Sequence, residues 1–201
     1  MQYLLYELKD YTDQQYEKDL KRVPPQRRNA AMQYYFLQDR KRSILAYRLL
    51  QACIRKEFGL ELTPEFVFGP YGKPSVTGHP EIFFSMSHCD TAALCAVDIA
   101  PVGADVENSI ETETSLLEMA CDPKEIRRIL SSEDPQNAFA ACWTRKESVS
   151  KLTGTGIAGI SDPRELPSED GGGYLFYTRT IPEKKLAFSI CSLAPQEKKT
   201  E

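Results

Sequence analysis

The sequence lacks several features that define common classes of protein. It has two histidines, His79 and His88, so chemistry that depends on histidine has few candidate residues. No apolar run approaches the roughly 20 residues that a transmembrane helix needs, and Glu7 comes too early for a signal peptide. Six cysteines occur without a CxxC pair, which is typical of free thiols in a reducing compartment and not of disulfides or a zinc site. We therefore expect a cytoplasmic protein with no membrane partner.

Charge and length set further limits. The net charge is −4, so nucleic acid is not expected as a partner, although a local basic patch is compatible with this balance. With 201 residues, 41% of them hydrophobic, the chain can bury a substantial core in one large domain or two small ones.

Helix and strand signals alternate along the chain. The segment from Arg27 to Phe58 has no Gly or Pro and carries an apolar stripe, which predicts one helix that ends at Gly59. Asp134 as N-cap and Gly154 as stop predict another helix over 135–152. Polar, helical sequence is expected from Glu107 to Leu130, and loop over the Gly- and Pro-rich residues 68–80. Strands are expected over residues 3–8, 82–107, 170–180 and 186–194, and a frayed tail over 195–201.

The predicted helix over 135–152 places charge on its apolar face. At about 100° per residue, Lys146 falls within about 20° of Phe139, with Glu147 at the edge of the stripe and Lys151 about 40° further round. One interpretation is that Glu147 and Lys151 form an ordinary exposed pair. The other starts from Lys146, because a lysine on an apolar face either reaches solvent or holds an anion. On that interpretation, the helix lines a cleft that contains an anion.

A second charged pattern lies in the segment PVGADVE. Its alternation predicts a strand with Asp105 and Glu107 on one face, about 6.6 Å apart. Two such carboxylates can share a hard cation, and Mg²⁺ in particular is bound by few protein carboxylates together with substrate phosphates. Glu147 could complete the site as a third carboxylate. The alternative is a half-exposed strand whose outer face happens to be acidic.

Smaller signals accompany these segments. Lys73 lies in the turn YGKP, where its amine could meet a phosphate, and Ser87 and His88 end a predicted strand. Taken alone, such residues are more often a solvated loop lysine and a structural histidine. Basic residues also cluster on the expected long helix, and by themselves would form a solvated face: Arg27, Arg28, Arg40, Lys41 and Arg42.

Taken in order, four motifs resemble those of the 4′-phosphopantetheinyl transferases of the larger, surfactin-synthetase-activating type. They are YGKP, FFSMSHC, VGADVE, and WTRKESVSK followed by LTGTGI. The family pattern is a GKP turn, an N-x-SHS strand end, a G-x-D-x-E strand and a W-x-x-KE-x-x-x-K helix, and the match extends from the DRKR segment to Gly156. The resemblance implies an α+β fold of two pseudo-twofold-related α/β halves, residues 1–100 and 101–201, with the active site in the cleft between them. We expect this unit to be a monomer.

The resemblance also implies roles for individual residues. The Mg²⁺ ligands would be Asp105, Glu107 and Glu147. The residues that bind coenzyme A would be Arg42, Lys73, Ser87, His88, Lys146 and Lys151. Glu147 and Lys151 would be catalytic, Glu147 as the base, directly or through water, and Lys151 beside the diphosphate. Arg27 is expected near the 3′-phosphate and Glu125 near the metal.

The implied reaction transfers the 4′-phosphopantetheine arm of coenzyme A to a serine of an acyl or peptidyl carrier protein and releases 3′,5′-ADP. Three positions depart from the family pattern, since Cys89 replaces a serine, Ser85 an asparagine and Ala104 an isoleucine. None of them removes an expected ligand. The alternatives are a Mg²⁺-dependent hydrolase of nucleotides or coenzyme A, and a non-catalytic module that binds coenzyme A.

Overall fold

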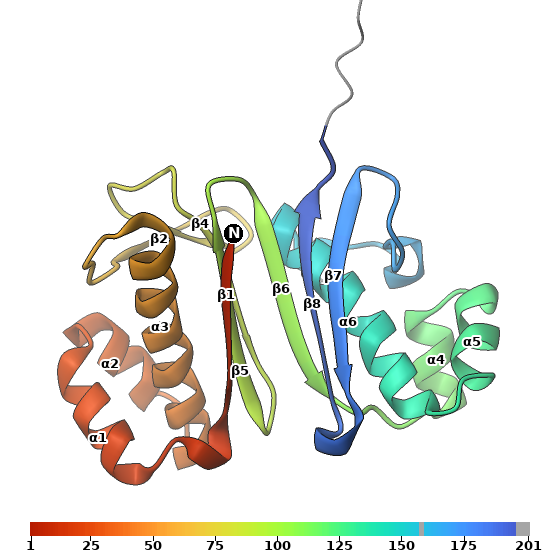
Figure 1. Ribbon diagram of the computed structural model, residues 1–201, viewed down its shortest axis with the longest axis horizontal. Coiled ribbons are helices and arrows are strands. Elements are labelled where there is room, and N and C mark those ends of the chain that lie inside the picture. Colours follow the sequence, from red (N-terminus) through yellow and green to blue (C-terminus); the bar gives the residue numbers. More distant parts are fainter. Residues whose placement is uncertain (157–158, 196–201) are drawn as a thin grey trace, which may run out of the picture.

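Two three-stranded antiparallel sheets lie face to face in the centre of the molecule, and each is covered on its outer side by a long helix (Figure 1). This computed structural model describes residues 1–156 and 159–195. The expected tail lies, apart from Pro195, outside the described residues. None of the helices in the described part of the chain could span a lipid bilayer.

The two sheets share one strand order. The first contains β1 (Gln2–Glu7), β5 (Ala92–Asp98) and β4 (Phe83–His88), in the order β1-β5-β4. The second contains β6 (Val102–Asn108), β8 (Leu186–Leu193) and β7 (Tyr174–Ile181), in the order β6-β8-β7. In both sheets the last strand in sequence lies in the middle. The α+β class is therefore confirmed, and the division of the chain at residue 100 stays a prediction.

Helices complete the layers. The first sheet is covered by α3 (Leu37–Phe58) and the second by α6 (Pro135–Thr153), with the remaining elements at the periphery (Figure 1). The smaller elements are η1 (Leu8–Asp10), α1 (Asp13–Arg22), α2 (Pro25–Met32), β2 (Phe66–Phe68), β3 (Pro74–Val76), α4 (Thr114–Ala120), α5 (Pro123–Leu130), η3 (Pro163–Glu165) and η4 (Pro182–Lys184).

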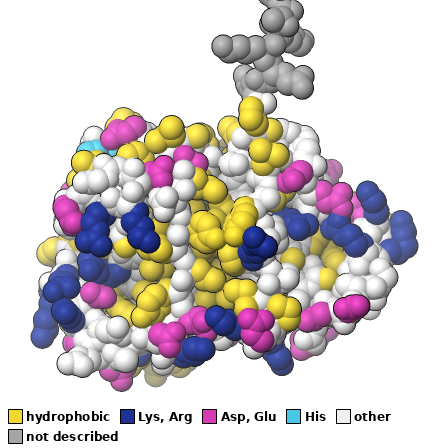
Figure 2. Space-filling view, in the orientation of Figure 1, with side chains coloured by type: hydrophobic (Ala, Val, Ile, Leu, Met, Phe, Trp, Pro, Cys, Tyr) yellow, Lys and Arg dark blue, Asp and Glu magenta, His cyan; other side chains and the backbone are white. Residues whose placement is uncertain are grey.

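Strand β5 shows how the layers are held together. Its side chains alternate between the two faces of the sheet, and because residues 92–97 are all apolar, both faces can be buried along this stretch. Cys95 and Val97 pack in the cluster under α3. Leu94 and Ala96 pack instead against the second sheet, in a cluster with residues such as Ile190. Figure 2 shows the edge of this apolar boundary between the two sheets.

Two local predictions are wrong. The expected helix over 27–58 is divided into α2 and α3 by the segment from Gln33 to Phe36. The guanidinium of Arg40 donates to the carbonyl oxygens of Tyr34 and Tyr35 and so stabilises this break, which no Gly or Pro marks in the sequence. Residues 68–80, expected as loop, include β3, which pairs with β2 in a short hairpin.

The second long helix matches its prediction. Asp134 caps α6 by accepting from the backbone N–H of Asn137, and Gly154 ends the helix in the left-handed conformation. Of the predicted inward stripe, Phe139 and Cys142 are buried and Trp143 is half-buried, and Lys146 beside Phe139 is buried as well.

Candidate active site

Helix α6 lies directly against β6 because residue 103 has no side chain. A Cβ atom at Gly103 would lie 1.8 Å from the backbone oxygen of Ser148 and 2.6 Å from the backbone nitrogen of Leu152. No other residue can therefore occupy this position without moving the helix. This close approach brings Lys151 of α6 to Asp105 of β6. A glycine inside a strand pattern is a known sign of close backbone approach, and it could have been interpreted from the sequence.

Asp105, Ser87 and Lys151 form a connected cluster at the boundary between the two halves. The ammonium of Lys151 lies 2.5 Å from Oδ1 of Asp105 and donates to the hydroxyl oxygen of Ser87 at 2.9 Å. The hydroxyl of Ser87 donates to the same Oδ1 at 2.7 Å. Asp105 is 1% exposed, and its second oxygen, Oδ2, is buried without a hydrogen-bond partner among the described residues. The cluster thus joins α6 to β4 and β6, two strands that come much earlier in the sequence.

Two further carboxylates extend the negative charge of this cluster. Burial, followed by repulsion from Asp105, raises the pKa of Glu107 to about 7. Burial, followed by repulsion from Asp105, also raises the pKa of Glu147. Lys151 opposes both effects. The group therefore carries more negative charge than its one lysine offsets, and together with the orphaned Oδ2 this suits a divalent cation with oxygen ligands.

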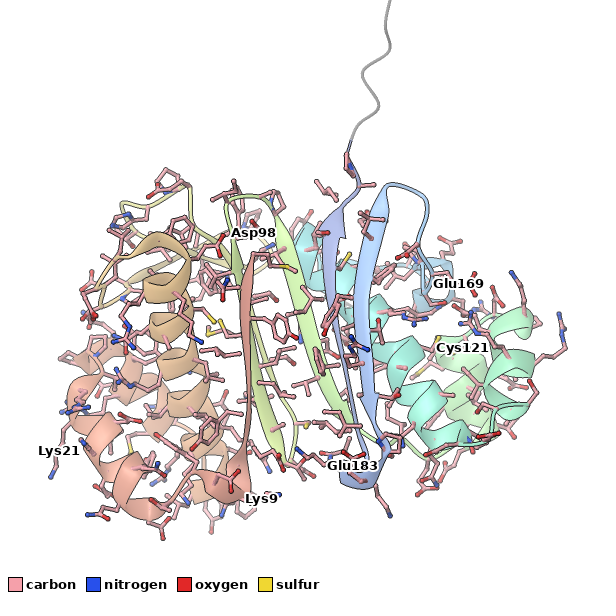
Figure 3. The ribbon with its side chains drawn as sticks, in the orientation of Figure 1. Lys9, Lys21, Asp98, Cys121, Glu169 and Glu183 are labelled. Carbon is pink, nitrogen blue, oxygen red and sulfur yellow. The ribbon has the colours of Figure 1, made fainter. Side chains whose placement is uncertain are left out.

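The predicted acids are not the tightest group of potential metal ligands. Among the described residues, three such side chains have ligand atoms within 4.8 Å of one another at Cys121, Glu125 and Cys142. That group lies among α4, α5 and α6, where Figure 3 labels Cys121. The binding of one ion by Asp105, Glu107 and Glu147 together stays a prediction.

Lys146 has an anionic partner, but this partner is a protein side chain. Its ammonium lies 2.9 Å from Oε2 of Glu125 and donates to the backbone oxygens of Pro163 and Arg164 at 3.2 and 3.3 Å. Its side chain is 0% exposed, and at about 100° per residue it points about 140° away from Lys151. The structure therefore does not bring Lys146 together with the other expected coenzyme A ligands. Glu125, its partner, is also buried in the second half.

Lys73 and Lys151 line one pocket. Its volume is about 250 Å³, and Ser85, Met86 and Gly154 also line it. The ammonium of Lys73 donates to the backbone oxygen of Leu152 at 2.7 Å, at the C-terminal end of α6. Burial lowers the pKa of Lys73, as expected for an amine that is partly withdrawn from water.

Arg42 and His88 lie together at the opposite end of β4. Arg42 pairs with Asp39 at 2.6 Å and with Asp90 at 2.8 Å. The pKa of His88 is lowered by desolvation and then by the positive charges of Arg42 and Lys151. A row of cationic side chains thus follows β4, from Lys73 through Lys151 to Arg42.

Arg27 is held further inside the first half. Its guanidinium donates to the backbone and hydroxyl oxygens of Ser43 and lies over the ring of Tyr47. Its expected place near the 3′-phosphate stays a prediction.

An α+β fold with an acidic cluster and a row of cations along one strand suits an enzyme that acts on a phosphate ester. Comparison with known proteins shows the family. The family model of the 4′-phosphopantetheinyl transferase superfamily matches residues 101–193. The chain is 31% identical to the 4′-phosphopantetheinyl transferase psf-1 of Bacillus pumilus, over 85% of this chain and 77% of that protein.

Other relatives give the same family. The chain is 24% identical to the 4′-phosphopantetheinyl transferase Sfp of Bacillus subtilis (strain 168), over 78% of this chain and 71% of that protein. It is 30% identical to HetI of a Nostoc strain, over 66% and 60%. The chain therefore belongs to the 4′-phosphopantetheinyl transferases, which transfer the phosphopantetheine arm of coenzyme A to a carrier protein.

Proposed function

We propose that the cluster of Asp105, Ser87 and Lys151 is the catalytic centre of this transfer, that the reaction needs Mg²⁺, and that it releases 3′,5′-ADP. The observation that carries the proposal is the buried Asp105, with one oxygen held by Ser87 and Lys151 and the other without a partner in the part of the chain that the structure describes. Asp105, Glu107 and Glu147 would hold the ion. When bound, Mg²⁺ would offset the negative charge of the diphosphate.

The protein's own side chains bind and orient the two substrates. Phosphoryl transfer depends mainly on positioning and on the stabilisation of charge. Lys73, Lys151, His88 and Arg42 supply donors along β4 for the phosphates of coenzyme A, and the hydroxyl of Ser87 lies among them. Lys151 is 30% exposed, so its ammonium can turn from Asp105 to a phosphate oxygen.

Glu147 is the proposed base. The hydroxyl oxygen of the carrier serine bonds to the β-phosphorus of coenzyme A, the bond from this phosphorus to the bridging oxygen of the diphosphate breaks, and 3′,5′-ADP leaves. The serine proton passes to Glu147, directly or through a water molecule. The pKa of Glu147 is raised and so lies closer to neutral pH, and a general base is most efficient when its pKa is near the working pH. Lys151 stabilises the charge that develops on the leaving oxygen.

We further propose that the halves 1–100 and 101–201 act as one monomeric unit in the cytoplasm. The six cysteines are buried free thiols, which supports a reducing compartment.

Intact-mass analysis tests the reaction. Apo carrier proteins from fatty-acid, polyketide and peptide synthesis are incubated with this protein, coenzyme A and MgCl₂. We expect each accepted carrier to gain the mass of one phosphopantetheine and an equal amount of 3′,5′-ADP to form. Formation of 3′,5′-ADP without any carrier would indicate a hydrolase instead. Binding of coenzyme A without any product would indicate a non-catalytic module.

A further inference from the structure

The two sheets present neighbouring edges to each other at β4 and β6. Each is an end strand of its own sheet, in the orders β1-β5-β4 and β6-β8-β7. The outward backbone groups of an end strand need partners when they are buried. The described residues form no ladder between these two strands. Instead, one side chain of β4, that of Ser85, supplies partners to the backbone of one residue of β6, Ala104.

A single hydroxyl group bridges the edges. The hydroxyl oxygen of Ser85 accepts from the backbone N–H of Ala104 at 2.9 Å, and the hydroxyl donates to the backbone oxygen of Ala104 at 3.3 Å. Ser85 is 6% exposed. It therefore satisfies both outward backbone groups of the residue that directly precedes Asp105.

The next side chain on the same face of β4 holds Asp105 itself. Ser85 and Ser87 are two residues apart and point the same way. Ser87 donates to Oδ1 of Asp105, which Lys151 also contacts, so that within residues 1–156 and 159–195 Oδ2 is the oxygen without a partner. One strand of the first half thus fixes both the backbone and the side chain around this carboxylate of the second half.

We propose that Ser85 is a positioning residue for the carboxylate of Asp105 and, through it, for the divalent ion. This inference rests on the proposed function, because it assumes that Asp105 is a ligand of that ion. Without the Ser85 hydroxyl, the peptide group before Asp105 loses its hydrogen bond to β4, and Asp105 keeps the hydrogen bond from Ser87. Loss of a hydrogen-bond partner that supports a metal ligand typically weakens metal affinity or activity by about 10-fold to 100-fold.

Four proteins test the proposal: the wild type, Ser85→Ala, Ser85→Thr and Thr178→Val. Ser85→Thr keeps the hydroxyl. Thr178→Val is the matched control, because it removes a hydroxyl that contacts Ser189 and Arg145 inside the second half and does not touch β4. The first readout is binding of Mn²⁺ in the presence of coenzyme A, followed by the electron paramagnetic resonance signal of free Mn²⁺. The second is kcat and KM for coenzyme A, and the third is thermal unfolding.

We expect Ser85→Ala to weaken Mn²⁺ binding and to lower kcat by about 10-fold or more, with little change in KM for coenzyme A. Ser85→Thr should recover most of both losses. Thr178→Val should lower thermal stability while Mn²⁺ binding stays at the wild-type level. If Ser85→Ala does not fold, Ser85→Cys takes its place, since a thiol has a similar shape but is a weak hydrogen-bonding group.

Two results would overturn the positioning role. One is wild-type Mn²⁺ affinity in Ser85→Ala together with reduced thermal stability, which would leave Ser85 a purely structural residue. The other is an equal loss of Mn²⁺ affinity in Thr178→Val, which would assign the effect to general loosening of the fold. A wild type that neither binds Mn²⁺ nor modifies any carrier would refute the proposed function itself. This outcome differs from the two above, in which the wild type is active and only the variants decide.

Discussion

Raising the pH from about 5 to about 8 in the absence of divalent ions should destabilise the folded protein through Glu107. In the folded state, burial and then the charge of Asp105 raise the pKa of Glu107 from 4.5 to about 7. Between these two values the folded protein binds more protons than the unfolded chain. The free energy of unfolding therefore falls as the pH rises. The contribution of the protonated carboxyl group is complete below about pH 4.5 and is lost as the pH passes about 7.

The structure sets the size of this effect. One pH unit corresponds to about 1.4 kcal/mol, so the interval from 4.5 to about 7 gives an upper limit of about 3 kcal/mol. The side chain of Glu107 is half-buried, and solvent screening reduces the expected change to about 1 to 2 kcal/mol. Bound Mg²⁺ should oppose the loss, because it favours the ionised carboxylate.

Urea denaturation measures the change. The wild type and Glu107→Gln are unfolded in EDTA at low, intermediate and high pH, with Glu118→Gln on the exposed surface of α4 as the control. The free energy of unfolding of Glu107→Gln should exceed that of the wild type by an amount that grows by about 1 to 2 kcal/mol toward high pH. Glu118→Gln should follow the wild type. Parallel curves for Glu107→Gln and the wild type would refute the reasoning, since they would mean that Glu107 titrates normally in the folded state.

Three other substitutions have defined outcomes. Gly103→Ala should lower the free energy of unfolding by about 3 kcal/mol or more, because the new methyl group overlaps the backbone of α6. Gly69→Ala is the control and should be tolerated, because the nearest atom to its new methyl group lies at 3.6 Å. Equal urea midpoints for the two variants would contradict this packing. Lys146→Met should cost about 3 to 5 kcal/mol by leaving Glu125 buried and unpaired, and adding Glu125→Gln should recover part of the loss. A stable Lys146→Met protein with impaired coenzyme A binding would contradict this structural role and assign Lys146 to coenzyme A binding. Glu147→Gln should lower the rate of carrier modification by about 100-fold or more with an unchanged circular dichroism spectrum, and a near-normal rate would remove Glu147 as the base.

Much of the candidate site could be predicted from patterns among residues that are close together in the sequence. The alternation in PVGADVE places Asp105 and Glu107 on one side of β6, and Val102 and Val106 pack on the other side, against the first sheet. Such assignments follow from backbone geometry alone, because a strand repeats every two residues and a helix every 3.6.

The break between α2 and α3 was not predictable in the same way. Residues 33–36 contain no helix-breaking residue, so intrinsic propensity favours a continuous helix. Hydrogen bonds from Arg40 to Tyr34 and Tyr35, together with the packing of two helices in place of one, decide the outcome. Tertiary contacts of this kind are absent from any local pattern.

The sequence by itself determined where α6 begins and ends, that Lys146 faces inward, and which acids share a strand, because caps and periodicity act within a few residues. Only the tertiary structure decided that the anion beside Lys146 is Glu125 and that the partner of Lys151 is Asp105. A buried ammonium requires a negative partner whatever its source. The choice among several acids depends on which strands and helices the packing of the two sheets brings within hydrogen-bond distance.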